Sequence, residues 1–169
     1  GSTMEGGMRV PMIVRYPDHI EAGSSCSELA TTMDFLPTFC GMSGAALPKA
    51  QLAGFDLSPL LFGEKAAKSQ YEALFYYRRR QLQAVRRGDW KWHLPLENTF
   101  PKWTDAYTKG KGRVGKLVNL TNDLQEKTDV AADNPKVMAK MQELADQAVA
   151  TLGNEATEGS EQRAALTLD

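Results

Sequence analysis

The stretch LQAVRRGDWKWHLP places the strongest constraint on how this chain can fold. Its residues alternate on both sides of a turn at 87–89, which is typical of two antiparallel strands joined as a hairpin. Successive side chains of a strand point to opposite faces, so Lys91 and His93 share one face, while the two tryptophans beside them and Leu94 share the other. The sequence therefore predicts a sheet with one core face and one face free for chemistry.

The C-terminal half predicts two further strands and one long helix. EALFYY and KLVNLTND read as strands. Asn134 and Pro135 open a helix that ends at Gly153, because apolar residues recur there every three or four positions: Val137, Met141, Leu144, Ala148 and Leu152. The stretch from Glu97 to Gly115 is rich in Lys and Gly and predicts a long loop. We expect a small antiparallel sheet with a packed terminal helix.

The N-terminal part predicts one strand and one short helix. The apolar run from Arg9 to Tyr16, RVPMIVRY, suits a strand buried on both faces of a sheet. Asp34 is placed as an N-cap, with Pro37 in the first helical turn. The expected buried side of that helix consists of Phe35, Leu36, Phe39, Cys40 and Met42. The following GFDLSPLLFG predicts a turn at Asp56 that apolar neighbours anchor to a core.

Composition excludes some classes and leaves others open. The 169 residues are 42% hydrophobic and 24% charged, and no apolar run approaches the roughly 20 residues that span a bilayer. Between Arg78 and Lys116 eleven basic residues face three acidic ones, a net charge of +8. Such a region is either a binding surface for polyanions or an ordinary solvated surface. Whether Cys26 and Cys40 pair is open, because two cysteines define no framework.

The chain contains no complete set of catalytic residues. It has no phosphate-binding glycine loop, no CxxC pair, no HExxH helix and no cluster of carboxylates for a divalent cation. Of its two histidines, His19 reads as a loop residue. His93 is the better candidate for binding a substrate, and Lys91 is the second candidate. A purely structural role for His93 remains the alternative.

Five stretches together resemble sulfatases of the arylsulfatase type. GSTMEGGMRVPMIVRYP is similar to the segment that follows an active-site lysine in that family, and TTMDFLPTFCGMSG resembles its D-x-x-P-T helix. GFDLSPLLFG resembles its G-x-D-L-x-P-L-L turn, and LQAVRRGDWKWHLP its C-terminal hairpin. LVNLTNDLQEKTDVA is similar to its L-x-N/D-L-x-x-D-P-x-E-x-x-N-V-A strand and turn, with Leu124 where proline is usual and Asp129 where asparagine is usual. The five occur in the family's order over nearly the whole chain.

The resemblance implies hydrolysis of sulfate esters. In that family the nucleophile is a formylglycine made from the Cys or Ser of a C/S-x-P-x-R motif, beside calcium or magnesium held by Asp and Asn. Neither Cys26 nor Cys40 is followed by Pro and Arg at that spacing, and the family's lysine would fall immediately before Gly1. We therefore expect no catalytic and no metal-binding residue in this chain, and no activity from the chain alone. Lys91 and His93 would line the far wall of the substrate pocket.

The fold class implied is an α+β fragment of the alkaline phosphatase/sulfatase-like α/β fold: a late strand and helix of the central domain, plus a small C-terminal antiparallel sheet with its packed terminal helix. The expected boundaries are residues 1–64 for the end of the catalytic domain, 65–153 for the subdomain with the sheet, and 154–169 for a disordered tail.

The resemblance also implies partners and a compartment. The expected substrate of the intact protein is a sulfated small molecule or glycan, with no membrane and no nucleic acid as partner, in a periplasmic or secreted setting. The isolated chain should self-associate through the apolar run at 9–16. Two alternatives remain open: a related phosphate or phosphonate ester hydrolase, and a non-catalytic module that binds polyanions.

Overall fold

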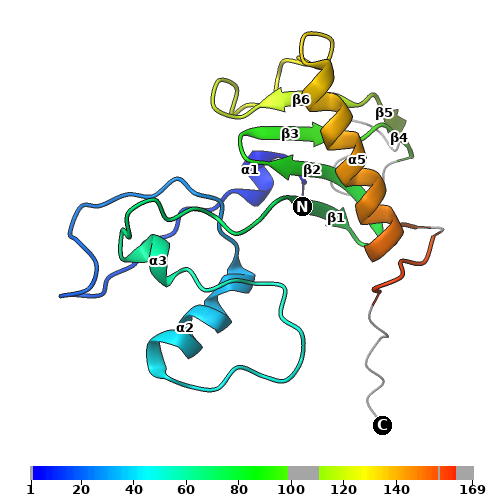
Figure 1. Ribbon diagram of the computed structural model, residues 1–169. Coiled ribbons are helices and arrows are strands. Elements are labelled where there is room, and N and C mark those ends of the chain that lie inside the picture. Colours follow the sequence, from blue (N-terminus) through cyan, green and yellow to red (C-terminus); the bar gives the residue numbers. More distant parts are fainter. Residues whose placement is uncertain (1, 99–110, 156, 163–169) are drawn as a thin grey trace. The chain divides into compact units, whose positions relative to one another are not determined.

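The chain consists of two compact units in the computed structural model, which describes residues 2–98, 111–155 and 157–162 (Figure 1). One unit joins residues 1–10 to residues 72–169, and the other comprises residues 11–71. The boundaries expected at 64 and 153 stay a prediction.

The first unit is built on a four-stranded antiparallel sheet in the order β1-β2-β3-β6. Its strands are β1 (Leu74–Arg78), β2 (Gln81–Arg87), β3 (Trp90–His93) and β6 (Lys116–Asn119). The strands predicted from EALFYY, from the hairpin sequence and from KLVNLTND are confirmed. Gly88 lies between β2 and β3 at φ 56°, in the left-handed region that glycine enters at little cost, and this conformation makes the tight hairpin turn possible.

The predicted terminal helix is confirmed as α5 (Pro135–Leu152), which lies across one face of the sheet (Figure 1). A bulge at Tyr76/Tyr77 shifts the register of β1 and β2, so Leu82 and Val85 both face the helix although they are three residues apart. The buried core between sheet and helix consists of Leu82, Val85, Trp92, Leu117, Met141, Leu144, Ala145 and Ala148. The tryptophan side of the predicted alternation is therefore the core face.

A second, two-stranded pair lies in the region predicted as one long loop. β4 (Leu96–Asn98) pairs antiparallel with β5 (Lys111–Arg113). The loop prediction for 97–115 is therefore wrong at both ends, because backbone pairing outweighs the low strand propensity of lysine and glycine there. Residues 99–110 between these strands lie outside the described residues. So do residues 163–169, most of the second half of the predicted tail.

The second unit contains a 3-10 turn, η1 (Thr32–Asp34), and two helices, α2 (Phe35–Ser43) and α3 (Ser58–Leu61). Asp34 occupies the predicted N-cap position of α2, but its fully buried carboxylate does not cap that helix. It accepts hydrogen bonds from Thr31 N (2.6 Å), Phe55 N (2.8 Å) and the Tyr71 hydroxyl (2.5 Å). The D-x-x-P-T sequence thus ties three separate segments together.

The turn that follows α2 explains the glycine of GFDLSPLLFG. A Cβ on Gly54 would lie 2.1 Å from Met33 O, so no other residue fits that backbone approach. Asp56 lies in a turn, as predicted, and its Oδ1 accepts from Ser58 N at 2.8 Å. Leu57 is buried, and its N–H donates to Thr38 Oγ1. Asp34, Gly54 and Asp56, which lie in stretches that carried the resemblance, therefore have structural roles in this unit.

Two predictions for the N-terminal part are wrong. Residues 9–16 form no strand in this chain. Val10 and Ile13 are 69% and 94% exposed, which agrees with the uncovered apolar run through which the isolated chain is expected to self-associate. An apolar run specifies burial but supplies no pairing partner, and no described residue pairs with this segment. On α2 the inner side is Pro37, Thr38 and Cys40, whereas the larger side chains expected there, Phe35, Leu36 and Phe39, are exposed. Small residues fit the close contact of α2 with the turn at 54–57 better than phenylalanines do.

Two further sequence questions receive direct answers. Cys26 is exposed and Cys40 buried, and both are free thiols. Among the described residues, no helix is both long enough and apolar enough to span a lipid bilayer.

Candidate functional site

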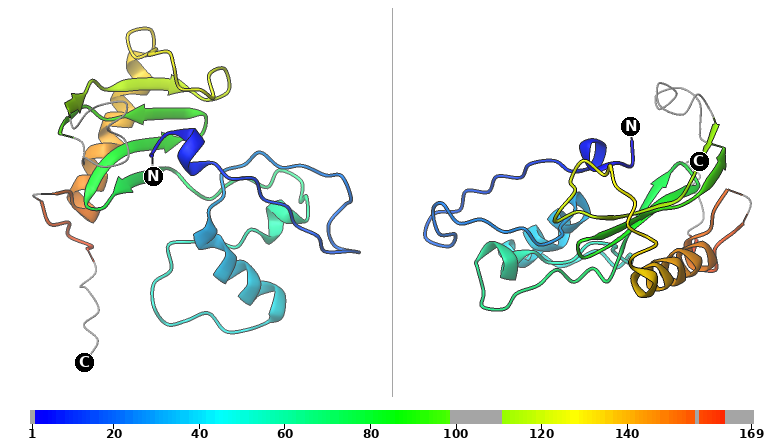
Figure 2. Two further views of the ribbon diagram at one scale, coloured as in Figure 1. Left: turned by 180° about the vertical axis from the view of Figure 1, so that it is seen from behind. Right: turned by 90° about the horizontal axis from the view of Figure 1, so that it is seen from above.

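A cluster of charged side chains is buried on the face of the sheet opposite α5. We call it the ionic cluster: Glu5, Lys91, His93 and Glu126, of which no side chain is more than 4% exposed. Lys91 and His93 come from β3, and Glu126 follows the turn after β6. Glu5 begins α1 (Glu5–Met8), which covers this face of the sheet, as the view from above in Figure 2 shows.

Lys91 lies between the two carboxylates of the cluster. Its Nζ is 2.8 Å from Glu5 Oε1 and 3.0 Å from Glu126 Oε1. The same ammonium lies 4.5 Å from the centre of the Tyr76 ring, a favourable cation–π distance. Arg86 completes the arrangement, with its guanidinium 3.5 Å from Glu5 Oε2. Two carboxylates therefore balance the charges of one lysine and one arginine, which is what burial of such groups requires.

Glu126 makes the most varied contacts in the cluster. Its Oε1 lies 2.7 Å from His93 Nε2, and its Oε2 accepts the backbone N–H of Glu5 at 2.6 Å. The carboxylate thus binds a strand, through Lys91 and His93, and the N-terminal segment at the same time. Because α1 is one turn long and contains two glycines, its own helical hydrogen bonds cannot hold it in place. Its attachment depends on the contacts of Glu5 and on the bond from Thr3 Oγ1 to Gln83.

The cluster shifts the pKa values of two of its members. Burial alone would raise the pKa of Glu126, but the hydrogen bonds from His93 and Glu5 N–H and the charge of Lys91 lower it to about 2. Burial lowers the pKa of His93 below its usual 6.5, and this effect outweighs the neighbouring Glu126 carboxylate. At neutral pH the cluster therefore contains an ionised Glu126 beside a neutral imidazole.

Two further basic residues border the cluster. Arg113 donates from Nε to Leu94 O at 3.1 Å and from a terminal nitrogen to Gln83 O. Burial lowers its pKa to about 10. Lys116 donates to the backbone carbonyl of Glu126. Both cations thus fix backbone around the ionic cluster.

The sequence placed Lys91 and His93 together correctly, on the face opposite the tryptophans. The prediction that this face is free for chemistry is wrong, because α1 and the segment around Glu126 cover it, and Lys91 and His93 are 0% and 2% exposed. Their contact with a substrate stays a prediction. His19 belongs to the other unit, where its ring stacks on Tyr16 at 4.1 Å between ring centres.

Sequence reasoning missed Glu5 and Glu126. Both lie inside stretches that carried the resemblance, but a single glutamate in a turn gives no sign of burial. The sequence of β3 contained a usable signal: two basic residues that share one face of a short strand need carboxylate partners if that face is covered. Nothing in the sequence indicates that the face is covered.

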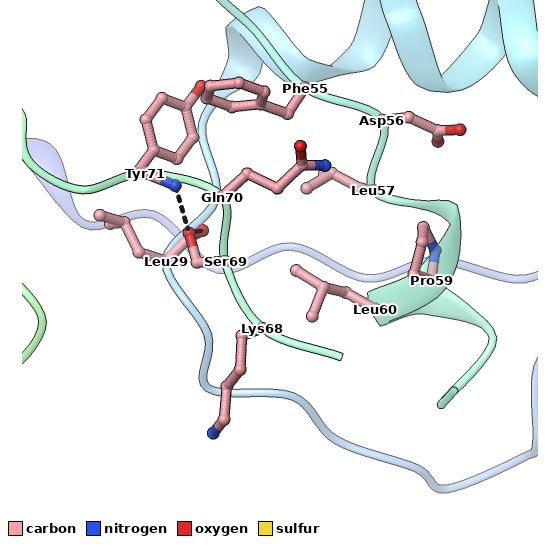
Figure 3. A pocket seen from close by; sticks show the side chains of 10 residues that line it. All are labelled: Leu29, Phe55, Asp56, Leu57, Pro59, Leu60, Lys68, Ser69, Gln70 and Tyr71. Atoms are coloured by element: carbon pink, nitrogen blue, oxygen red, sulfur yellow. Dashed lines mark hydrogen bonds between the residues drawn. The ribbon is translucent and has the colours of Figure 1, made fainter. Parts of the chain in front are cut away.

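The hollow in the second unit lacks a comparable set of groups. It holds about 270 Å³, including space open to solvent, and its lining mixes apolar side chains with the polar residues Asp56, Lys68, Ser69 and Gln70 (Figure 3). The Lys68 amino group and the Asp56 carboxylate point away from its centre in Figure 3. Lys68 instead pairs with Glu28 at 2.9 Å, and Asp56 with Ser58. The two charged groups at this hollow therefore do not converge on a common point.

A metal site does not arise from the residues that the structure describes. Within them, no three His, Cys, Asp or Glu side chains gather as ligands. The two carboxylates of the ionic cluster are already bound to Lys91, so these residues do not fit calcium or magnesium, which need several oxygen ligands.

Comparison with characterised proteins identifies relatives of this chain. Arylsulfatase A of Homo sapiens is 45% identical over 111 residues, which are 63% of this chain and 21% of that protein. Steryl-sulfatase of Mus musculus is 43% identical over 94 residues, or 55% of this chain and 14% of that protein. The chain thus spans about a fifth or less of the length of these relatives.

A solved structure agrees with this relationship. The crystal structure of Ps i-CgsB matches with a TM-score of 0.63 and 28% identity, covering 86% of this chain and 30% of that one. The same protein has been solved in complex with k-i-k-neocarrahexaose. The small antiparallel sheet with its packed helix, which the sequence predicts, therefore also has a counterpart in that solved structure.

The match to a protein family covers most of the chain. Residues 3–152 match the family described as N-sulphoglucosamine sulphohydrolase, C-terminal. That span contains α1, the whole sheet and α5, and with them every residue of the ionic cluster. The chain belongs to this family of sulfatase C-terminal regions.

Proposed function

We propose that this chain is the C-terminal part of an enzyme that hydrolyses sulfate esters. The observation that carries the proposal is the family match over residues 3–152, together with relatives named for arylsulfatase and steryl-sulfatase activity. The nucleophile, a formylglycine, and a calcium or magnesium ion would come from other parts of the protein. A departing sulfate group concentrates negative charge, which such a cation and nearby basic side chains stabilise.

The part contributed by this chain would be architectural. The ionic cluster fixes the segment around Glu5 on the sheet, and β3 places Lys91 and His93 beneath it. A segment held in this way can present backbone and side chains at a fixed position beside a substrate pocket. Lys91 and His93 are proposed to act at that wall of the pocket.

The substrate is proposed to be a sulfated small molecule or a sulfated glycan, by analogy with the relatives. The complex of Ps i-CgsB with k-i-k-neocarrahexaose supports a glycan. The names of arylsulfatase A and steryl-sulfatase support a small molecule. A periplasmic or secreted location is proposed from the family alone.

A separate polyanion-binding module is less well supported. Its only support was the basic region from Arg78 to Lys116. In the structure several of those cations are engaged within the chain: Lys91 with two carboxylates, Arg113 and Lys116 with backbone carbonyls. Such groups release no counterions to a nucleic acid or a glycan.

The test is selectivity between ester types. The intact protein should release nitrophenol from p-nitrophenyl sulfate much faster than from p-nitrophenyl phosphate, and mass spectrometry should find a formylglycine in it. Preference for the phosphate ester would support the related hydrolase instead. Activity on neither ester, with tight salt-sensitive binding to heparin, would support the polyanion-binding module.

A further inference from the structure

The position of the proton on His93 follows from its partner. Nε2 of the ring lies 2.7 Å from Glu126 Oε1, which also accepts from Lys91 Nζ at 3.0 Å. An ionised carboxylate can only accept hydrogen bonds, so the ring nitrogen that faces it carries the hydrogen. A neutral imidazole has one N–H, and Nδ1 is then a bare acceptor.

We infer that Glu126 is a positioning residue that fixes His93 as the Nε2–H tautomer, so that His93 meets a substrate as a hydrogen-bond acceptor through Nδ1. This inference rests on the proposed function, because it concerns the wall of a sulfatase pocket. The group recognised is a donor, a hydroxyl or an amine of the substrate. A sulfate oxygen is excluded as the partner, since it too is only an acceptor.

The surroundings of the ring support this assignment. Nδ1 is buried and has no hydrogen-bond partner among the described residues. The charged groups that act on the ring are Glu126 after β6, Lys91 on β3 and Arg113 on β5. Two of these three are cations, and both disfavour a second proton on the ring. Burial, which lowers the pKa of His93, acts in the same direction.

The enclosure of Nδ1 separates the inference into two measurable parts. A substrate reaches this atom only after the residues that cover it move aside. The tautomer, in contrast, is a property of the protein without substrate. It can therefore be measured on this chain by itself.

The first experiment reads the tautomer by NMR. The chain has two histidines, so His19→Gln leaves His93 as the one imidazole in the spectrum. Long-range nitrogen–proton correlations at slightly alkaline pH should show a protonated Nε2 and a bare Nδ1. In a folded Glu126→Gln variant the two tautomers should become mixed. If the protein that keeps Glu126 shows mainly Nδ1–H, or mainly the doubly protonated ring, that spectrum alone overturns the inference.

The second experiment uses the intact enzyme and two substitutions that separate the ring nitrogens. The Asn side chain in His93→Asn places an oxygen acceptor near the position of Nδ1, whereas the Gln side chain in His93→Gln places an amide donor near Nε2. On a sulfated sugar with free hydroxyls, His93→Asn should keep about threefold to tenfold more kcat/KM than His93→Gln, the effect of one hydrogen bond. On p-nitrophenyl sulfate, which has no donor, the two variants should be equal.

The two experiments separate a failure of this inference from a failure of the proposed function. Rates are compared per folded molecule, so a loss of stability shared by both variants does not count as recognition. Equal rates on the hydroxyl-bearing substrate, or a faster His93→Gln enzyme, would overturn recognition through Nδ1. An intact protein that hydrolyses no sulfate ester would overturn the proposed function, while the NMR result on the tautomer would stand.

Discussion

Replacing Glu126 by glutamine tests the ionic cluster most severely, because the change removes a charge and keeps the volume. The Glu126 side chain is 1% exposed and lies within 3.0 Å of Lys91 Nζ, which is itself fully buried. In Glu126→Gln the lysine retains Glu5 alone, at 2.8 Å, while Arg86 draws on the same carboxylate. The buried region is left with an uncompensated positive charge.

Removing one partner of a buried ion pair typically costs 3–5 kcal/mol. The amide oxygen of glutamine can still accept one hydrogen bond, so we expect a loss of about 3 kcal/mol in the free energy of unfolding. For a chain of this length that corresponds to roughly 6–12 °C in melting temperature. Domains of this size have about 5–15 kcal/mol in total, so the change is large but compatible with folding.

Urea unfolding followed by circular dichroism measures this difference. The matched control is Glu143→Gln, which removes a carboxylate from a surface pair with Lys140 at 2.9 Å, where Glu143 is 64% exposed. That change should cost at most about 0.5 kcal/mol. If Glu126→Gln unfolds within about 0.5 kcal/mol of the unchanged chain, the cluster does not hold the segment as argued.

Three further outcomes are expected. The folded pKa of His93 lies below 6.5, and that of Glu126 is about 2 against an ordinary 4.5. The stability that each residue contributes is therefore complete above its ordinary pKa and is lost as the pH falls. Unfolding midpoints measured across acidic pH should decline, and the His93→Gln variant should lack the upper part of that decline. Asp34→Ala should cost about 3 kcal/mol, since it leaves Thr31 N and Phe55 N without their acceptor; a smaller effect than that of Asp56→Ala in the same urea assay would refute this. The chain should self-associate in sedimentation experiments, and Ile13→Glu, at a residue 94% exposed, should reduce that association without lowering stability; equal sedimentation of both proteins would argue against it.

The sheet and its terminal helix could be predicted because their signals are local. Alternation around Gly88 specifies the hairpin, and the recurrence of Met141, Leu144 and Ala148 specifies the helix face that packs on it. The strand expected at 9–16 failed for the opposite reason. An apolar run states that burial is favourable, while a strand also needs a partner that the run itself does not contain.

The candidate site could be predicted only halfway. The two-residue period placed Lys91 and His93 on one face, which the structure confirms. Their partners Glu5 and Glu126 are 121 residues apart in the chain, and only the tertiary fold brings them together. Because that face is covered, Lys91 and His93 belong to a buried, charge-balanced cluster and not to the open surface that the sequence predicted.

The central claim is that this chain is the structural C-terminal part of a sulfatase and carries none of the reacting groups itself. The most direct measurement is the release of sulfate from an aryl sulfate by the intact protein and by the 169-residue chain, side by side. The account predicts turnover by the intact protein that depends on a divalent cation, and none by the chain with or without added calcium. Turnover by the purified chain, or an intact protein inactive on every sulfate ester offered, would contradict it.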